Sequence, residues 1–175
     1  ADETRYRTPA ENLRASILKH LYNPNNNYFY KLIHEHLGNV THDETVDISS
    51  FLGVFRFGIL DINDERLSKA FAVVEERLCC ETSIGGAVRY EGDKYYRTSS
   101  SVPGNPWFVT TLWYVQYLIA KAVTEEDLAP AKKWLNWTAA HAMPSGILSE
   151  QINPHTGEQI SAAPLTWSHA EFVYT

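Results

Sequence analysis

Glu150 is the side chain of this sequence whose type and setting best suit catalysis. It lies in segment 147–172, where small polar residues are interrupted by Pro and Gly. Trp167 follows at the start of the next predicted helix. A carboxylate can take a proton from water, and a flat indole can cover the apolar face of a pyranose ring. The two side chains together indicate a site that processes sugars.

Three segments resemble the C-terminal half of the glucoamylase-type inverting glycoside hydrolases. They are Ala87–Tyr96 (AVRYEGDKYY), Gly104–Phe108 (GNPWF) and Ser149–Trp167, which runs from Ser-Glu-Gln to Leu-Thr-Trp. The resemblance extends over residues 10–175 and is strongest over residues 84–172.

The resemblance implies that Glu150 is the general base. In inverting hydrolysis, a carboxylic acid protonates the leaving oxygen, and an ionised carboxylate about 6.5–9.5 Å away activates water. Ser149, Gln151 or Ser161 could donate hydrogen bonds that keep Glu150 charged. Taken alone, a loop glutamate of this kind is more simply a solvated surface charge.

The resemblance also implies that Arg89 and Asp93 hold sugar hydroxyls near the bond that is cut. Arg89 would donate from its guanidinium N–H groups, and Asp93 would accept. Tyr90, Tyr95 and Tyr96 would line or support the rim of the site. An Arg89–Asp93 ion pair that only holds the loop is the alternative, and both roles can coexist.

Two tryptophans are candidates for stacking on a sugar. Trp167 lies seventeen residues after Glu150 and is assigned to the pocket. Trp107 belongs to GNPWF, which resembles the family's entry to an inner helix, and it fits either the pocket wall or the core. Residues 97–103 look like an insertion relative to fungal members, so the sugar subsite that this loop contacts stays open.

The family's general acid lies upstream of the base, where a tryptophan is followed directly by a glutamate. The five tryptophans of this sequence are followed by Phe, Tyr, Leu, Thr and Ser. We therefore expect residues 1–175 to be a partial catalytic domain that lacks its N-terminal half and the general acid. General acid catalysis is typically worth about 10²- to 10⁴-fold, so the chain alone should hydrolyse nothing appreciable.

The expected ligand is an α-linked glucan or oligosaccharide, with no cofactor. A net charge of −6 without a basic stripe argues against nucleic acid and anionic membrane as partners. The sequence also has no apolar run long enough to span a bilayer. Half a toroid would expose inner-helix side chains, for which we name Trp113, Tyr117 and Leu118. We therefore expect association with the missing half or self-association.

Neither the histidines nor the cysteines indicate a further site. His34–His36 and His42–Asp43 have metal-binding residue types, but no third ligand is fixed in place, so no metal site is predicted. Cys79 and Cys80 are adjacent and cannot cross-link distant parts of the chain. The absence of a disulfide framework slightly favours a soluble cytoplasmic protein, although the compartment itself stays unknown.

Hydrophobic periodicity predicts a mainly helical chain with long polar loops. The first helix should carry Pro9 in its first turn with Thr8 as its cap. A second should run over Asp47–Phe57 with Asp47 as its N-cap. The remaining predicted helices span 63–78, 106–123 and 124–142, the last of these capped by Thr124, and a final helix begins near Trp167.

Residues outside the helices are predicted to form loops and one short strand. Tyr28–Ile33 should be a short isolated extended segment, and Ser83–Tyr96 a Gly-bearing loop. The final helix should be capped by Ser168 or Thr166. Because that helix has barely begun at Thr175, we expect another segment to complete the domain.

Periodicity alone gives an all-α class, and the resemblance implies about half of an (α/α)6 toroid. In such a fold, long loops at one end of an inner ring of helices form one side of an active-site funnel. Two functions are compatible with this reading. The first is an exo-acting glycoside hydrolase that releases glucose with inversion, such as a glucoamylase, a glucodextranase or a related trehalase. The second is a non-catalytic glucoamylase-like domain for glycan binding or protein assembly, as in phosphorylase kinase regulatory subunits.

Overall fold

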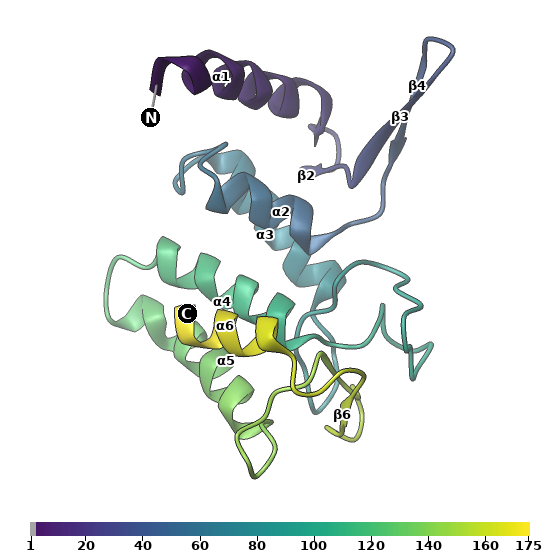
Figure 1. Cartoon of the computed structure of the whole chain (residues 1–175), viewed down its shortest axis with the longest axis vertical. Helices are drawn as coiled ribbons and strands as arrows, with labels where there is room; N and C mark the ends of the chain where they lie inside the picture. Colours follow the sequence, from purple (N-terminus) through teal and green to yellow (C-terminus); the bar gives the residue numbers. More distant parts are fainter. Residues whose placement is uncertain (1–2) are drawn as a thin grey trace. The chain divides into compact units, whose positions relative to one another are not determined.

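The computed structural model describes residues 3–175 and is mainly helical, which confirms the predicted class (Figure 1). The chain forms two compact units, Ala1–Val73 and Val74–Thr175. Within the described residues, the strands pair only as three antiparallel two-stranded ribbons. No helix of residues 3–175 has both the length and the hydropathy needed to cross a bilayer.

The first helix, α1 (Glu3–His20), begins earlier than predicted. Pro9 lies inside it, so the prediction that Thr8 caps the helix is wrong. The side chains of Glu3 and Arg7, one turn apart, form an ion pair that supports the turn before the proline. Pro9 lacks the N–H that would continue the hydrogen-bond ladder, and the residues before it stay helical despite that loss.

Two hairpins follow α1, where the sequence predicted one isolated extended segment. In the first, β1 (Tyr22–Asn23) pairs with β2 (Tyr28–Phe29). In the second, β3 (Leu32–His36) pairs with β4 (Asn39–Asp43). The β3–β4 turn has Leu37 at φ 50° and Gly38 at φ 78°, as a two-residue hairpin turn requires. Leucine is an unusual residue for that position, so the sequence did not signal the turn.

Helix α2 (Ile48–Arg56) confirms the second predicted helix and its cap. The Asp47 carboxylate accepts from the backbone N–H of Ser49 at 2.9 Å. Gly58, with φ +64°, follows the helix end. The buried face of α2 consists of Ile48, Phe51, Leu52 and Val54.

Helix α3 (Glu65–Leu78) begins two residues later than predicted. Asp64 accepts from the backbone N–H of Arg66 at 2.9 Å, which satisfies a free donor of the first turn. Five apolar residues of this helix recur at helical spacing, and four of them, Leu67, Ala70, Val74 and Leu78, are buried. Phe71, the fifth, is half-buried, and its ring lies 5.7 Å from that of Phe51.

In the second unit, helices α5 (Ala129–Ala140) and α6 (Thr166–Tyr174) both pack against α4 (Phe108–Lys121). The first ten residues of α4 are buried, as its apolar sequence predicted. The expected exposure of Trp113 and Tyr117 is wrong, because their exposed fractions are 7% and 3%. Leu118 is half-buried. Burial of α4 within the chain removes the predicted apolar surface at these residues.

The N-cap residues before α5 are Glu125 for the short first turn and Leu128 for α5 itself, so the prediction that Thr124 is the N-cap is wrong. Thr124 nevertheless takes part in a reciprocal pair of hydrogen bonds just before this turn. The Thr124 hydroxyl accepts from the Asp127 N–H at 3.3 Å, and the Asp127 carboxylate accepts from the Thr124 N–H at 2.8 Å. This first turn is a 3₁₀ helix, η1 (Glu126–Leu128), and α5 ends at Ala140 rather than at the predicted residue 142.

Helix α6 begins where predicted but without a side-chain cap. Its N-cap is Leu165, so the predicted caps Ser168 and Thr166 are both wrong. The buried Ser168 hydroxyl instead donates to the carbonyl of Ser149 at 2.8 Å. The N–H of Leu165 donates to the carbonyl of Leu148 at 3.0 Å, so the start of α6 is bonded to the Glu150 loop.

Candidate active site

Main-chain hydrogen bonds hold the three sequence segments side by side. The Trp107 N–H donates to the Ala87 carbonyl at 3.0 Å, and the Ile152 N–H donates to the Pro106 carbonyl at 3.0 Å. Trp107 and Gln151 also form an antiparallel bridge. Each of these contacts joins main-chain atoms, so these bonds do not depend on the side chains of the residues that make them.

The Glu150 loop contains a hairpin in which β5 (Gln151–Ile152) pairs with β6 (Gln159–Ile160). Main-chain hydrogen bonds also hold Glu150, which directly precedes this hairpin. The Glu150 N–H donates to the Ala162 carbonyl at 2.9 Å, and the Glu150 carbonyl accepts from the Phe108 N–H at 3.3 Å. Below it lies an apolar core of Phe108, Leu148 and Ile152. This packing holds the glutamate backbone against the first residue of α4.

Gln159 gives the loop a side-chain brace. Its amide oxygen accepts from the Ser149 N–H at 2.7 Å, and its amide nitrogen donates to the carbonyls of His141 and Ile147 at 2.7 and 3.0 Å. The residue before Glu150 is therefore bonded to the end of α5.

The Glu150 side chain is half-buried, and its Oε2 accepts from the hydroxyl of Ser161. Ser161 has a φ of +67°, a left-handed conformation that is uncommon outside glycine. The hydroxyl of Ser161 fixes the orientation of the Glu150 carboxylate. The predicted contact between Ser161 and Glu150 is therefore present.

Ser149 and Gln151 do not reach the Glu150 carboxylate. The Ser149 hydroxyl donates to the Gln151 carbonyl at 2.6 Å, and the Gln151 amide oxygen accepts from Asn105 at 2.8 Å. Neighbouring residues of an extended segment point to opposite faces, so Gln151 faces away from Glu150. The prediction that Gln151 bonds directly to the base is wrong, and Gln151 supports the loop through Asn105.

Asn105 is a site residue that sequence reasoning missed. It is 1% exposed, and its amide nitrogen donates to the Tyr96 carbonyl and to Gln151, each at 2.8 Å. Its amide oxygen accepts from the N–H and the hydroxyl of Thr98 at 3.1 and 2.9 Å. The amide thus joins loop 92–105 to the Glu150 loop. Its position directly before proline in GNPWF was the available signal.

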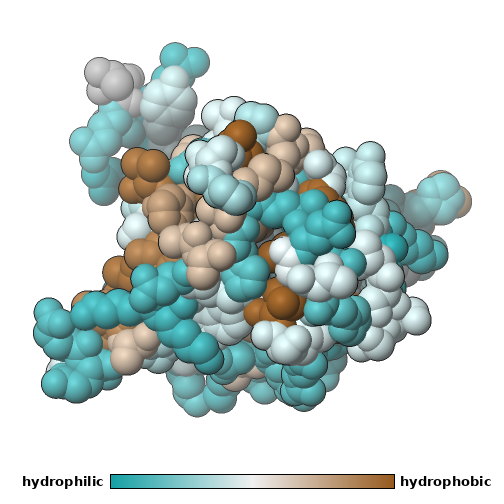
Figure 2. All heavy atoms as spheres, turned by 90° about the horizontal axis from the view of Figure 1, so that it is seen from below, coloured by the Kyte–Doolittle hydropathy of each residue, from teal (hydrophilic) through white to brown (hydrophobic). Residues whose placement is uncertain are grey.

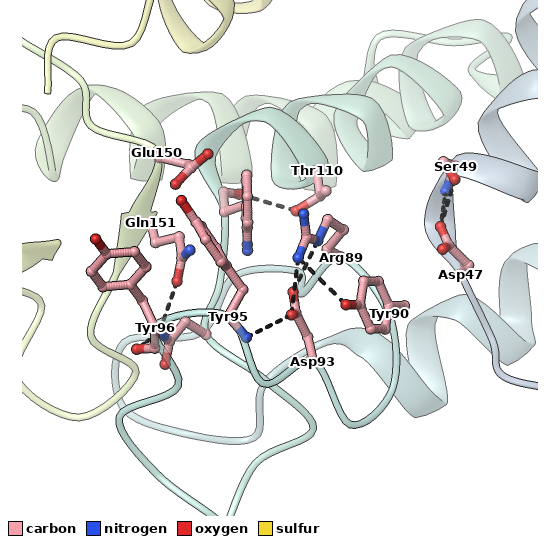
Figure 3. A network of polar contacts seen from close by, with 12 residues as sticks. Asp47, Ser49, Arg89, Tyr90, Asp93, Tyr95, Tyr96, Thr110, Glu150 and Gln151 are labelled. Atoms are coloured by element: carbon pink, nitrogen blue, oxygen red, sulfur yellow. Dashed lines mark hydrogen bonds and ion pairs between the residues drawn. The ribbon is translucent and has the colours of Figure 1, made fainter. Parts of the chain in front are cut away.

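Arg89 and Asp93 form a bidentate ion pair (Figure 3). Arg89 donates from Nε to Asp93 Oδ2 and from Nη2 to Oδ1, both at 3.0 Å. Oδ1 also accepts from the Tyr95 N–H at 3.0 Å. Burial acts to lower the pKa of Arg89, but its hydrogen bonds with Asp93 raise it overall. Asp93 is 1% exposed, so its carboxylate lies on the buried side of the pair. Arg89, whose side chain is 33% exposed, is the member of the pair that solvent reaches.

Aromatic rings surround the Arg89 guanidinium. Its central carbon lies 4.9 Å from the ring centroid of Tyr90, 5.5 Å from that of Tyr95 and 4.5 Å from that of Trp107. Such contacts orient a cation through the negative face of each ring. In Figure 3, the Tyr95 ring extends from the arginine side toward Glu150.

The two candidate tryptophans differ in exposure. Trp107 is 4% exposed, which favours the core interpretation over the pocket wall, and it packs under Arg89. Trp167 is 49% exposed, and its ring centroid lies 5.3 Å from that of Trp113 in an edge-to-face contact. Trp167 therefore keeps free surface on which a ring could stack, and Trp107 does not.

The surface that carries these loops is largely polar. In Figure 2, hydrophilic and intermediate residues cover most of the visible face, with smaller hydrophobic areas between them. Tyr95 and Tyr96 are 46% and 61% exposed. Tyrosine has an apolar ring and a polar hydroxyl, so these side chains suit a ligand with both apolar faces and hydroxyls.

Metal coordination has no support in the described part of the chain. Residues 3–175 contain no cluster of three or more His, Cys, Asp or Glu side chains that could hold an ion. His34 and His36 lie exposed on β3, and His42 stacks on Tyr30 with ring centroids 4.2 Å apart.

Comparison with known proteins identifies relatives of the chain. The family model described as glycosyl hydrolases family 15 matches residues 1–129 and 128–175. An uncharacterized glycosyl hydrolase of Methanocaldococcus jannaschii is 35% identical over 141 residues, which are 75% of this chain and 21% of the relative. The glucoamylase of Clostridium sp. (strain G0005) is 30% identical over 144 residues, which are 78% of this chain and 20% of that protein. The chain thus spans about a fifth of the length of these relatives.

Solved structures share the architecture. A bacterial glucoamylase complexed with acarbose matches with a TM-score of 0.78 and 26% identity, over 97% of this chain and 28% of that chain. The glucoamylase of Hormoconis resinae matches with a TM-score of 0.59 and 20% identity, over 89% of this chain and 35% of that chain. At 20% identity the second match shows the fold alone. The predicted architecture, part of an (α/α)6 toroid, is confirmed.

Proposed function

The chain belongs to glycosyl hydrolases family 15, and from that premise we propose that it supplies the general-base side of an exo-acting glycoside hydrolase. The intact enzyme would release glucose from the non-reducing ends of α-glucans with inversion of configuration. The observation that carries this proposal is the Glu150 carboxylate, half-buried and hydrogen-bonded by Ser161 on a braced loop.

Glu150 would take a proton from the water that attacks the anomeric carbon. A base must present its carboxylate to the water, and the hydrogen bond from the Ser161 hydroxyl orients that carboxylate. A base must also keep its position while the water is oriented. The main-chain bonds of Glu150 to Ala162 and Phe108 supply that rigidity.

Arg89 and Trp167 would bind the sugar. The buried Asp93 fixes the guanidinium, whose remaining N–H capacity can donate to hydroxyls. Trp167, with half of its surface exposed, would cover the apolar face of a pyranose ring. The glucoamylase structure with acarbose supports an oligosaccharide as the ligand class.

The leaving oxygen would receive its proton from a carboxylic acid outside residues 1–175. We therefore treat these residues as a partial catalytic domain. Without the acid, the rate of hydrolysis should be lower by about 10²- to 10⁴-fold, so these residues alone should be inactive. Association with the missing half of the domain is part of the proposal, since that half would supply the acid. Association with a second copy is not, because Trp113 and Tyr117 are buried within the chain.

Replacement of Glu150 by Gln in the intact gene product that contains these residues tests the assignment. Turnover of maltotriose should fall by about 10²- to 10⁴-fold, because the amide cannot take a proton from water. Glu158→Gln is the matched control, since Glu158 is an exposed glutamate of the same loop, and it should leave turnover unchanged. Proton NMR of the first product should show β-glucose, the inverted anomer.

Three results would count against the proposal. Equal activity of Glu150→Gln and the unaltered protein would remove Glu150 as the base. Initial release of α-glucose would contradict inversion. Hydrolysis of maltotriose by the 175-residue chain itself would contradict the proposal that the general acid lies outside these residues. Binding of maltotriose by an intact product without hydrolysis would instead favour a non-catalytic glycan-binding domain.

A further inference from the structure

Glu171 is a buried carboxylate that the proposed mechanism does not use. It is 6% exposed and lies on α6, one turn after Trp167. Its Oε2 accepts from the side-chain amide of Gln116, on α4, at 2.7 Å. Its Oε1 accepts from the indole N–H of Trp167 at 3.3 Å.

Two contacts at different angles thus restrain the Trp167 indole. The hydrogen bond to Glu171 lies in the plane of the ring, and the buried Trp113 ring meets it edge-to-face at 5.3 Å and 62°. A half-exposed side chain without such contacts would sample several rotamers. These two contacts favour the one orientation of the indole that satisfies both.

Gln116 holds the carboxylate in turn. It is 7% exposed, and its amide nitrogen also donates to the Thr175 hydroxyl at 3.0 Å, whose own proton goes to the Glu171 carbonyl at 2.7 Å. The chain of contacts runs from the buried face of α4 through Glu171 to the exposed indole. An acceptor-only carboxylate suits this place, because donors approach both of its oxygens.

We propose that Glu171 is a positioning residue that fixes the Trp167 indole as a preformed stacking surface for a glucose ring of an α-glucan. This inference rests on the proposed function. An indole already held in its binding orientation loses less freedom when a sugar stacks on it. Immobilising one side chain on binding costs enough to weaken affinity by about 2- to 12-fold.

Glu171→Met is the primary variant, because methionine has similar volume, suits a buried position and offers the indole no comparable acceptor. Affinity for maltoheptaose should be measured by calorimetry in the intact gene product, in the Glu150→Gln background so that turnover does not interfere. We expect Glu171→Met to weaken binding by about 2- to 12-fold. Glu171→Gln should fall between Glu171→Met and the unaltered protein, since its amide oxygen can still accept from Trp167 while its amide nitrogen would face the Gln116 donor.

A double substitution separates positioning from a general effect on folding. If Glu171 acts through Trp167, adding Glu171→Met to Trp167→Phe should weaken binding no further than Trp167→Phe alone. Hydrogen exchange of the Trp167 indole N–H, followed by nitrogen-labelled NMR, should be faster in Glu171→Met. Equal losses in the presence and absence of Trp167, or unchanged indole exchange and affinity, would overturn the inference.

The failure of this inference differs from that of the proposed function. Maltoheptaose binding that depends on Trp167 but is unchanged by Glu171→Met would overturn the role of Glu171 and leave the proposed function standing. A protein that binds no maltoheptaose at all would overturn both.

Discussion

Loss of the Arg89 guanidinium should destabilise the chain, because it leaves Asp93 charged and buried. Arg89→Met removes both 3.0 Å hydrogen bonds to a carboxylate that is 1% exposed. Breaking a buried pair typically costs about 3–5 kcal/mol. Arg89 is itself 33% exposed, and Asp93 keeps the Tyr95 N–H, so we expect about 2–3 kcal/mol. Urea denaturation at pH 7 measures the difference in the free energy of unfolding.

Two comparisons make this expectation specific. Arg77 and Glu91 form an equally bidentate pair at 2.7 and 2.6 Å, but their side chains are 39% and 26% exposed. Arg77→Met should therefore cost under about 1 kcal/mol. Replacing both partners, Arg89→Met with Asp93→Leu, should recover most of the loss, because no buried charge remains. A single variant within about 0.5 kcal/mol of the unaltered chain, or a double variant no better than the single, would refute the reasoning.

Two further predictions concern a helix cap and the thiols. Asp47→Ala should lower the free energy of unfolding by about 1 kcal/mol, seen in the same urea assay, because the first turn of α2 loses its side-chain acceptor; no change would contradict the capping role. Burial raises the pKa of Cys79 and of Cys80 to about 12, so both thiols should react slowly with Ellman's reagent at pH 8 in the folded chain and quickly in urea. Rapid reaction of the folded chain would contradict this account. The raised pKa values favour the protonated thiols in the folded state, so the contribution of the thiols to the free energy of unfolding should be constant below about pH 9 and should fall as the pH rises toward 12.

The sequence predicted elements whose signals are local and failed where distant contacts decide. Asp47 caps α2 as predicted, because this cap needs only a residue two positions later in the chain. Ser168 has the same cap chemistry, but its hydroxyl bonds to Ser149, nineteen residues earlier in the chain. Pro9 was predicted in a first turn, but α1 already begins at Glu3.

The same distinction holds for the site. The Arg89–Asp93 pair has a spacing of four residues and was predicted as one of two readings. The contact between Glu150 and Ser161 was named among three options, and only the fold selects it. Asn105 and Glu171 could not be assigned from the sequence, because their partners lie 46 and 55 residues away. Burial of Trp107 likewise depends on how three loops meet.

The backbone bridges between the three loops leave the outward-facing side chains free to vary. The bonds from Trp107 to Ala87 and from Ile152 to Pro106 involve only main-chain atoms. Exchanging an outward-facing side chain on these segments therefore need not shift the carboxylate relative to the arginine. If the two groups act as proposed, the sugar hydroxyls that the loops recognise can change one such position at a time while the spacing of the two groups is kept.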